Sequence, residues 1–341
     1  MGVDLGEIIQ KRRLSLDDLS GNALAIDAYN ALYQFLAVIR GEKGEPLMDR
    51  QRRITSHLSG LFYRSVNLLE KGIKLVYVFD GEPPELKEAE IERRRSIKKE
   101  AIVRYEEAIR MGRVSEARKY AQMTSQLKDM MVDDAKRLLD SMGIPWIQAP
   151  SEGEAQAAFM AEKGYVHAAV SQDHDSLLFG APRLVRNLTI SGRRKLPGRD
   201  VYIEVEPEQV YLNEVIRTLG ITREQLVDIG ILVGTDFNPD GFSGVGPVKA
   251  LKLIRKYGSL EKVPDVQERL AVIDYKTIRE IFLKPKVTDA FELRWRRLDT
   301  DAVIEFLCRE RDFSETRVKT ALSRLDVIEK KKSETLERWF S

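Results

Sequence analysis

The sequence predicts an α/β fold with a mostly parallel central sheet flanked by helices. Short apolar runs alternate with helical patterns, which is the order of elements in a parallel sheet covered on both faces. Three of these runs end in an aspartate, at Asp27, Asp80 and Asp173. Ligands of open α/β folds bind at the carboxyl ends of the strands, so we expect these aspartates to meet at one edge of the sheet.

The composition of the chain limits its possible domain number, partners and cellular location. With 341 residues, 43% of them hydrophobic, the chain can bury a large core in one or two domains. Charged residues make up 32% but the net charge is only +2, so a nucleic-acid partner must be inferred from local basic clusters. The single cysteine, Cys308, excludes an internal disulfide. Because no signal peptide and no 18-residue apolar run is present, we expect an intracellular protein.

The first elements follow the strand and helix alternation closely. Residues 22–27 are a short apolar strand, and residues 28–39 have a helical pattern. An amphipathic helix is predicted over 55–71, followed by a second strand over 74–80. Gly81 and the two prolines after it end this strand directly beyond its aspartate.

Residues 149–180 concentrate acid more than any other stretch. The pattern predicts a helix over 152–163 and a strand over 167–172. Ser151 and Glu154 fit a helix capping box, which is a purely structural alternative for the acids of this helix. Capping does not account for Asp173 and Asp175, whose spacing would place both carboxylates on one side of a continuing strand.

A charged helical insert is predicted between about residues 84 and 134. From Arg93 to Lys119 there are ten basic and four acidic residues, a local net charge of +6. A solvated helix face with paired charges is the alternative to a phosphate-binding surface. Lys87 and Arg94 are seven residues apart, so they share a face if the helix is continuous, close enough to the acids to hold a phosphate.

The second half adds a basic hairpin and a glycine-rich turn. A strand is predicted over 184–188, and Arg193 to Lys195 precede a further strand over 201–205. After Asp236, a turn rich in glycine leads into a helix that begins at Pro247. Free backbone N–H groups at such a helix start can bind phosphate, although a turn of this kind is more often a simple connector.

The residue types favour a hard metal ion. Seven carboxylates, without a cysteine cluster and with three scattered histidines, suit Mg²⁺ or Mn²⁺ better than zinc. Two such ions can activate water and stabilise both oxygens of a phosphate displacement. We read His174 as structural. The carboxylates are Asp27, Asp80, Glu152, Glu154, Asp173, Asp175 and Asp236.

Five segments in order resemble the signature blocks of the flap endonuclease family of structure-specific 5′ nucleases, most of all its archaeal branch. They are LAIDAYNALYQFL, VYVFDGEPPELK, APSEGEAQAAFMAEKG, AVSQDHDSLLFG and VGTDFNPDGFSGVGPVKALKLIRKYG. The resemblance implies a PIN-like core, two Mg²⁺ ions with Mn²⁺ as an alternative, and a helical arch over about 82–134. It also implies a helix-two-turn-helix motif over about 229–258 that grips duplex DNA with a K⁺ ion.

The resemblance also assigns roles to residues. The seven carboxylates match the metal-site acids, while Lys87 and Arg94 match arch residues that hold the scissile phosphate. DNA contacts are implied for a further set: Tyr33 by stacking, Arg64 on the template strand, Gly244, Gly246 and Lys249 in the helix-two-turn-helix, and Thr55, Arg311 and Arg317 in a pocket for a 3′ flap. Val248 departs from the pattern, since a basic residue can occur there, and duplex grip is expected to be weaker.

The expected organisation is one nuclease domain over 1–325, with an N-terminal region of about 1–100 and an internal region of about 120–260. A tail over 326–341 resembles a sliding-clamp-binding peptide, with Leu336, Trp339 and Phe340 as anchors and Ser333 where glutamine is usual. Packing of this tail on the protein's own surface is the alternative.

The implied function is Mg²⁺-dependent cleavage of 5′ flaps, with 5′–3′ exonuclease activity, in Okazaki fragment maturation and base excision repair. The partners would be branched DNA and a sliding clamp, with the enzyme monomeric when free. The implied location is the cytoplasm, with the nucleoid, for an archaeal protein and the nucleus for a eukaryotic one. The alternatives are a 5′ exonuclease with a different junction preference and a non-catalytic DNA- or clamp-binding scaffold.

Overall fold

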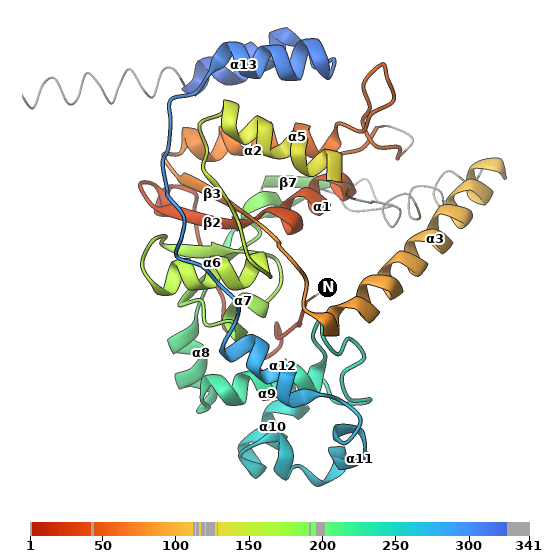
Figure 1. The fold of residues 1–341 in the computed structure, drawn as a ribbon, viewed down its shortest axis with the longest axis vertical. Coiled ribbons are helices and arrows are strands. Elements are labelled where there is room, and N and C mark those ends of the chain that lie inside the picture. Colours follow the sequence, from red (N-terminus) through yellow and green to blue (C-terminus); the bar gives the residue numbers. More distant parts are fainter. Residues whose placement is uncertain are drawn as a thin grey trace, which may run out of the picture.

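A computed structural model of the chain describes residues 2–41, 44–111, 113, 116, 120, 127, 129–190, 192–195 and 202–325. Its centre is a seven-stranded sheet with the order β1-β9-β6-β5-β2-β3-β4 (Figure 1). The strands of this sheet are β1 Arg12–Arg13, β2 Ala23–Asp27, β3 Lys74–Phe79, β4 Trp146–Gln148, β5 Ala168–Val170, β6 Arg183–Arg186 and β9 Glu208–Tyr211. A separate antiparallel hairpin consists of β7 Gly192–Lys195 and β8 Tyr202–Val205.

The sheet is mostly parallel, as the sequence predicts. β2 pairs in parallel with β3 on one side and β5 on the other, and β4 and β6 extend the parallel set. Among the described strands of this sheet, only β9 runs in the opposite direction: it pairs antiparallel with β6 and with the edge strand β1, which therefore runs in the same direction as the parallel set. Because Asp27 lies opposite Val78 in the register, Asp80 falls just beyond the end of β2 and the carboxyl ends coincide.

Helices cover both faces of the sheet. One face carries α1 Ala28–Val38, α2 Ser56–Glu70, α5 Asp129–Ser141, α13 Thr300–Ile304, the π-helix Glu305–Glu310 and a helix over 315–325. The core on the other face includes α6 Gly153–Glu162, α7 Asp175–Leu178, α8 Leu212–Leu219, α9 Arg223–Val233, α10 Pro247–Tyr257, α11 Gln267–Leu270 and α12 Tyr275–Leu283. Short 3₁₀ turns lie at η1 Asp17–Leu19, η2 Glu85–Lys87, η3 Leu188–Ile190, η4 Leu260–Lys262 and η5 Pro264–Val266.

The central strands β2, β3 and β5 are mostly apolar because both of their faces are buried. In β2, Leu24 and Ile26 belong to the core beneath α1 and α2, whereas Ala25 between them belongs to the core beneath α6. The same alternation holds in β3, where Tyr77 and Val78 lie in different cores. Period-two geometry therefore sends successive side chains into two separate hydrophobic layers.

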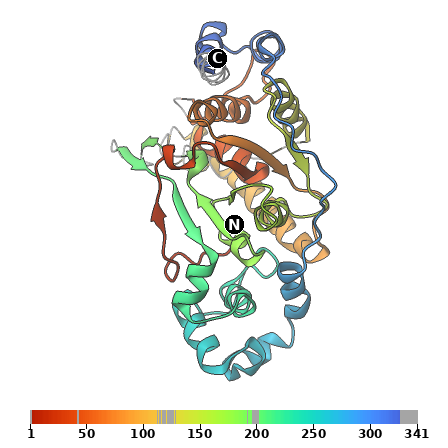
Figure 2. The ribbon, with the colours of Figure 1, turned by 90° about the vertical axis from the view of Figure 1, so that its left-hand side faces the viewer.

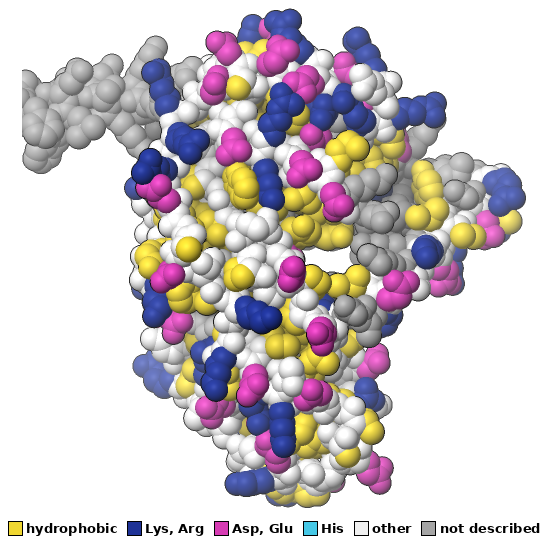
Figure 3. Space-filling view, viewed as in Figure 1, with side chains coloured by type: hydrophobic (Ala, Val, Ile, Leu, Met, Phe, Trp, Pro, Cys, Tyr) yellow, Lys and Arg dark blue, Asp and Glu magenta, His cyan; other side chains and the backbone are white. Residues whose placement is uncertain are grey.

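Helix α3, Glu88–Arg110, projects from the body as a single helix (Figure 1). Its described side chains are mostly exposed, with Ala101 and Ala108 buried. The helix begins after the 3₁₀ turn η2, which contains Lys87, so Lys87 and Arg94 do not belong to one continuous α-helix. On the face seen in Figure 3, lysine and arginine side chains are interspersed with acidic ones instead of gathering in one patch.

An extended segment, residues 285–299, links α12 to α13 along one side of the molecule, and we call it the strap (Figure 2). Gln156 of α6 donates to the carbonyl of Thr288 at 2.7 Å and accepts from its N–H at 2.9 Å. Trp295 donates its indole N–H to the carbonyl of Leu75 at 2.9 Å, and the N–H of Arg296 bonds the carbonyl of Gly143. The strap therefore joins both layers of helices to the sheet.

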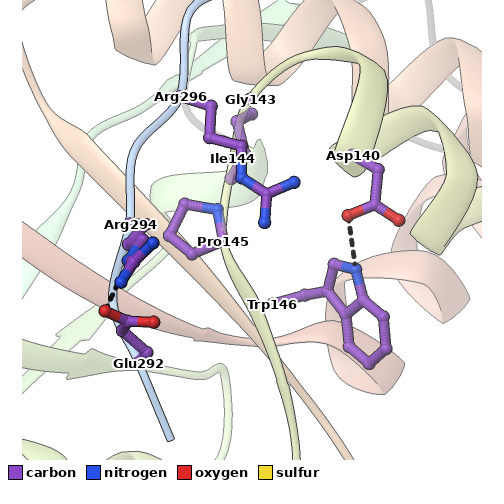
Figure 4. Close-up of a pocket in the computed structure, with 8 residues that line it drawn as sticks. All are labelled: Asp140, Gly143, Ile144, Pro145, Trp146, Glu292, Arg294 and Arg296. Carbon is purple, nitrogen blue, oxygen red and sulfur yellow. Dashed lines mark hydrogen bonds and ion pairs between the residues drawn. The ribbon is translucent and has the colours of Figure 1, made fainter.

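A cavity of about 260 Å³ lies between the strap and the turn before β4 (Figure 4). Trp146 donates to Asp140 at 3.1 Å inside it, and Arg294 pairs with Glu292 on the strap side. Both carboxylates of this hollow thus have partners. The guanidinium of Arg296 points into the same space (Figure 4).

Two local predictions are wrong. Ser151 does not cap α6, because its hydroxyl donates to the carbonyl of Glu82 and the helix begins at Gly153. The strand expected to end at Gln172 stops at Val170, and Asp175 is the first residue of α7. Asp173 and Asp175 are therefore brought together by a turn into a helix and not by strand alternation. In the described part of the chain, no helix is both long and apolar enough to cross a membrane.

Candidate active site

The predicted acids gather at the carboxyl edge of the parallel strands. Asp27 ends β2 and serves as the N-cap of α1, accepting from the N–H of Asn30 at 3.0 Å. Asp80 follows β3 and accepts from the N–H of Gly153 at 2.7 Å. A Cβ on Gly153 would lie 2.8 Å from this Asp80 oxygen, so only glycine lets the start of α6 approach the aspartate so closely.

Burial and mutual repulsion dominate the electrostatics of this edge. Burial raises the pKa of Asp27 and Glu154 well above ordinary carboxyl values, and neighbouring aspartates raise it further. Burial likewise raises the pKa of Asp175 to about 7, with Asp236 and Asp173 adding to the effect. Such a group of carboxylates holds its charge only when cations lie among them.

The acids of the α6 start and of the strand ends influence one another across the site. Burial raises the pKa of Asp80, Glu152 and Asp173, and in each case Asp236 raises it further. These electrostatic couplings include all seven carboxylates that the sequence singled out. The fold therefore brings together residues as distant in sequence as Asp27 and Asp236.

Lys87 places its ammonium group among these acids. Its Nζ lies 2.5 Å from Glu152 and 3.5 Å from Asp236. Burial lowers the pKa of Lys87, but the surrounding carboxylates of Glu152, Asp236 and Asp80 raise it more, and the lysine stays charged. In this conformation the ammonium partly neutralises the acids.

The donor set fits a hard divalent ion. The clustered groups offer only carboxylate oxygens, the ligands that Mg²⁺ prefers. No three histidine, cysteine, aspartate or glutamate side chains of the described residues form a closed metal-binding group in this conformation. The contact with Lys87 accounts for part of the separation between the carboxylates, since Glu152 lies against the ammonium.

Several groups that orient the acids are not apparent in the sequence. Ser171 donates its hydroxyl to Glu154, and the N–H of Val3 donates to Asp175 at 2.8 Å. Asn30 donates from Nδ2 to Asp173 at 3.3 Å. Asn30 lies three residues after Asp27 on α1, a spacing that could have identified it. Val3 could not be foreseen, because it reaches the site from the far end of the chain.

The buried histidine between two acids is structural, as expected. His174 is 1% exposed and its Nδ1 lies 3.3 Å from the N–H of Leu5 and from the carbonyl of Val3. It holds the N-terminal segment, which in turn reaches Asp175 through Val3.

Two of the arginines expected to contact DNA, Arg64 and Arg311, bond other groups of the protein. Arg64 is half-buried and donates through Nε to the carbonyl of Leu188 at 2.8 Å, and burial lowers its pKa to about 10. Arg311 is 8% exposed and its guanidinium bonds both oxygens of Asp134. Neither guanidinium is open to a phosphate in this conformation, because each is engaged in packing the fold.

The remaining members differ in exposure. Tyr33 lies half-buried on α1, Thr55 is buried before α2, and Arg317 lies 5.5 Å above the ring of Tyr63. Arg94 belongs to α3, but its side chain is outside the described residues, as are Ser333, Leu336, Trp339 and Phe340.

The glycine-rich turn has the predicted form. Gly246 is the N-cap of α10 with Pro247 in the first turn, and Gly244 has a φ of +72°. Lys249 donates to the carbonyl of Gly244 at 3.3 Å, and the neighbouring Val248 is 43% exposed. The N–H groups at this helix start are thus available near a lysine.

Comparison with known proteins identifies the family. Residues 1–101 match the XPG N-terminal domain and residues 143–236 match the XPG I-region. The chain is 55% identical to flap endonuclease 1 of Pyrococcus furiosus over 341 residues, covering 100% of this chain and 99% of the relative. The chain belongs to the flap endonuclease family. The resemblance, including its archaeal character, is confirmed.

Other relatives of the family agree. Flap endonuclease 1 of Ignicoccus hospitalis is 58% identical over 328 residues, or 95% of this chain and 93% of the relative. The solved structure of flap endonuclease-1 from Methanococcus jannaschii has 45% identity and a TM-score of 0.76, covering 95% and 98% of the two chains. The catalytic core of Rad2 in complex with DNA substrate, 23% identical with a TM-score of 0.69 over 94% and 97%, shares the fold. The PIN-like fold prediction is thereby confirmed, and the family consists of metal-dependent DNA nucleases.

Proposed function

We propose that this chain is a structure-specific 5′ flap endonuclease with 5′–3′ exonuclease activity. It hydrolyses DNA phosphodiesters where single and double strands meet, in Okazaki fragment maturation and base excision repair. The observation that carries the proposal is the group of buried carboxylates around Lys87 at the carboxyl edge of the sheet, next to the base of the projecting helix α3.

The seven carboxylates would hold two Mg²⁺ ions, and Mn²⁺ is an alternative. When bound, the ions supply activation of water and stabilisation of the charge that develops on the phosphate. The protein's part is to fix the carboxylates, which Asn30, Gly153, Ser171 and the N–H of Val3 do through hydrogen bonds.

Lys87 and Arg94 would hold the scissile phosphate. Lys87 already lies at the acid edge, where its ammonium faces Glu152 and Asp236. A phosphate bound next to the acids would draw the ammonium away from these carboxylates and towards its own oxygens. Arg94, nearly two turns into α3, would approach from the same base of the helix.

Duplex DNA would be held away from the acids. The helix start at Gly246 with Lys249 would contact phosphates, together with a K⁺ ion at the turn between α9 and α10. Tyr33 would stack on the DNA near the acids, while Arg64, Thr55, Arg311 and Arg317 would shape the surfaces for the template strand and the 3′ flap. Because Arg64 and Arg311 already bond the protein, we assign them chiefly to shaping those surfaces.

We assign residues 1–325 to one nuclease domain, with α3 as part of an arch over about 82–134. The N-terminal and internal regions, about 1–100 and 120–260, together build the acid edge. The tail over 326–341 would bind a sliding clamp, and the enzyme would be monomeric when free. In an archaeal cell it would act in the cytoplasm on the nucleoid.

A labelled double-flap substrate tests the proposal in a single-turnover assay with Mg²⁺. We expect the wild-type protein to cut at the junction. Asp173→Asn should lose at least tenfold in rate, a loss of about 1.4 kcal/mol or more of transition-state stabilisation, while still binding the flap. Asp17→Asn is the control, because Asp17 is an exposed aspartate paired with Lys71. Full activity of Asp173→Asn would contradict the assignment, and a scaffold would not cut at all.

A further inference from the structure

A line of polar side chains runs along helix α1 from the acid edge towards η3. Asn30 and Gln34 are one helical turn apart, so they lie on one face of α1. Asn30 donates from Nδ2 to Asp173 at 3.3 Å, and Gln34 donates from Nε2 to Oδ1 of Asn30 at 2.9 Å. Thr189 of η3 donates its hydroxyl to Oε1 of Gln34 at 2.5 Å. Three hydrogen bonds thus connect Thr189 to an acid of the active site.

The direction of these bonds is set at the Asp173 end, because a carboxylate oxygen can only accept a hydrogen bond, whereas a threonine hydroxyl can donate or accept one. A primary amide has one oxygen and one NH₂ group of nearly the same shape, so its orientation is decided by its hydrogen-bond partners. The Thr189 hydroxyl donates to the side-chain oxygen of Gln34, and the NH₂ group of Gln34 faces Asn30. The NH₂ group of Gln34 donates to the side-chain oxygen of Asn30, and the NH₂ group of Asn30 faces Asp173. The Gln34 amide and the Thr189 hydroxyl therefore hold the Asn30 amide in the orientation that offers a donor, and not an oxygen, to the carboxylate.

The Thr189 end is held firmly. Thr189 is 7% exposed and follows Leu188, whose carbonyl accepts the Arg64 Nε at 2.8 Å. Asn187, just before this turn, has a φ of +60°, which fixes the direction in which the chain enters η3. Helix α2, which carries Arg64, thereby sets the position of the Thr189 hydroxyl.

We propose that Gln34 and Thr189 are positioning residues for the hydrolysis, acting through Asn30 on Asp173. The inference rests on the proposed function, in which Asp173 is a metal ligand. The relay keeps one Asp173 oxygen bonded to an amide donor, which orients the carboxylate. Partners of this kind commonly change metal affinity or activity by about 10–100-fold when they are lost.

Substitutions at the start of the relay test it with two readouts. Calorimetric Ca²⁺ binding without DNA reports on the acids, and single-turnover cleavage at limiting Mg²⁺ reports on the reaction. Thr189→Val keeps the shape and removes the hydroxyl, and we expect about tenfold weaker Ca²⁺ binding and a similar loss of rate. Thr189→Ser restores the hydroxyl and should recover both to within about twofold. Thr218→Val, at an exposed position of α8, is the matched control.

Gln34→Glu gives the sharpest test, because charge and orientation predict opposite results. An added negative charge near the acids would by itself strengthen Ca²⁺ binding. The carboxylate of a glutamate, however, can only accept hydrogen bonds. The NH₂ group of Asn30 would therefore turn towards the carboxylate at position 34, and the Asn30 oxygen would face Asp173. We therefore expect weaker Ca²⁺ binding in Gln34→Glu than in Gln34→Met, which has no group to turn Asn30.

The outcomes separate the relay from the proposed function. If Asp173→Asn cuts like the wild type, the proposed metal site is wrong. If Asp173→Asn is inactive but Thr189→Val and Gln34→Glu bind Ca²⁺ and cut within about twofold of the wild type, only the relay is wrong. A Thr189→Ser variant as impaired as Thr189→Val would also overturn it, since packing and not the hydroxyl would then matter. Thermal unfolding of each variant shows that the losses do not come from misfolding.

Discussion

At the scale of single residues, burial decides what the charged and polar groups can do. Lys87 is expected from its sequence position to hold a phosphate, yet in the structure it is bonded to Glu152 and lies near Asp236. His57 is fully buried, and neither of its ring nitrogens has a hydrogen-bond partner among the described residues. Lys87 and His57 each lead to a prediction that depends on their contacts in the folded structure and not on the residues next to them in sequence.

Removing Lys87 should have opposite effects on metal binding and on cleavage. In Lys87→Met the acids lose a competing cation, so we expect Ca²⁺ to bind several-fold more tightly without DNA. Single-turnover cleavage should fall at least about a hundredfold, because the group proposed to contact the phosphate is lost. The flap dissociation constant should change little, since most affinity comes from phosphate contacts elsewhere.

Calorimetry and rapid-quench assays on the same preparation measure these effects. Lys249→Met is the comparison, because Lys249 lies at the start of α10, away from the acids. Equal losses of flap binding and of rate in Lys87→Met would mean that Lys87 belongs to a general electrostatic surface.

His57 should make the protein sensitive to acid. Burial lowers the pKa of His57 to about 3, with the charge of Arg311 adding to the effect. Between the unfolded pKa of about 6.5 and this value, the unfolded chain binds a proton that the folded chain does not. The free energy of unfolding should therefore fall with decreasing pH through this window, by up to about 1.4 kcal/mol per pH unit from this group.

Urea unfolding of the wild type and of His57→Leu at pH 7 and pH 5 isolates the contribution. The variant should lose less stability on acidification, and at pH 7 it should be no less stable, because two unbonded buried nitrogens are removed. Equal pH dependence in the two proteins would show that His57 is not the source. The active-site carboxylates are unchanged in both proteins, so their own titration cancels in the comparison.

At the scale of elements, the positions of the acids depend on how strands and helices meet. Asp27 and Asp80 lie where the sequence predicts, because β2 and β3 are in-register parallel strands that end together. Glu152 and Asp175 depend instead on helix starts, at α6 and α7. The strap bonds to the turn before β4 and so fixes this side of the sheet.

Gly143 should be the most sensitive point of the strap contact. It has a φ of +67°, and a Cβ there would lie 2.2 Å from the carbonyl oxygen of Arg296. We expect Gly143→Ala to cost about 2–4 kcal/mol, from backbone strain plus displacement of the strap. Thermal or urea unfolding measures the cost.

Gly164 provides a matched control. It also has a positive φ, +77°, but an added Cβ would meet no atom within 4 Å. Gly164→Ala should therefore cost only about 1–2 kcal/mol, the backbone term alone. Equal costs at the two positions would mean that the strap yields without penalty.

At the scale of the whole molecule, two hydrophobic cores on either side of one sheet hold the site together. One core joins β2 and β3 to α1, α2 and α5, and the other joins the same strands to α6 and to the α9–α12 region. The acid edge lies where elements of both layers meet, since α1 carries Asn30 and α6 carries Glu154. Helix α3 extends beyond these cores.

The tail gives a prediction about partners. A peptide of residues 329–341 should bind a sliding clamp with micromolar affinity, because Leu336, Trp339 and Phe340 supply the apolar anchors while Ser333 lacks the amide of glutamine. Ser333→Gln should tighten binding by about 1 kcal/mol, a typical net value for a hydrogen bond. Calorimetric titration against the clamp is the measurement. A peptide with Trp339 and Phe340 changed to alanine is the control, and no binding by either the native or the Ser333→Gln peptide would contradict the prediction.

The sequence by itself determined the mostly parallel sheet, the aspartates that end or follow three of its strands, and the acids that gather at its carboxyl edge. These features follow from local rules, because apolar runs, helical periodicity and chain breaks act over a few residues. It also predicted α10 correctly, since Gly246 and Pro247 mark a helix start by their own backbone preferences.

Only the tertiary structure decided how the acids are oriented and what surrounds them. The contact of Val3 with Asp175 and the relay from Thr189 through Gln34 and Asn30 to Asp173 join residues far apart in the chain. Ser151 follows a capping pattern but bonds Glu82 instead, because a nearby carbonyl in the folded chain was a better partner than its own helix. Hydrogen bonds between distant segments depend on packing, and packing is not encoded in any local pattern of residues.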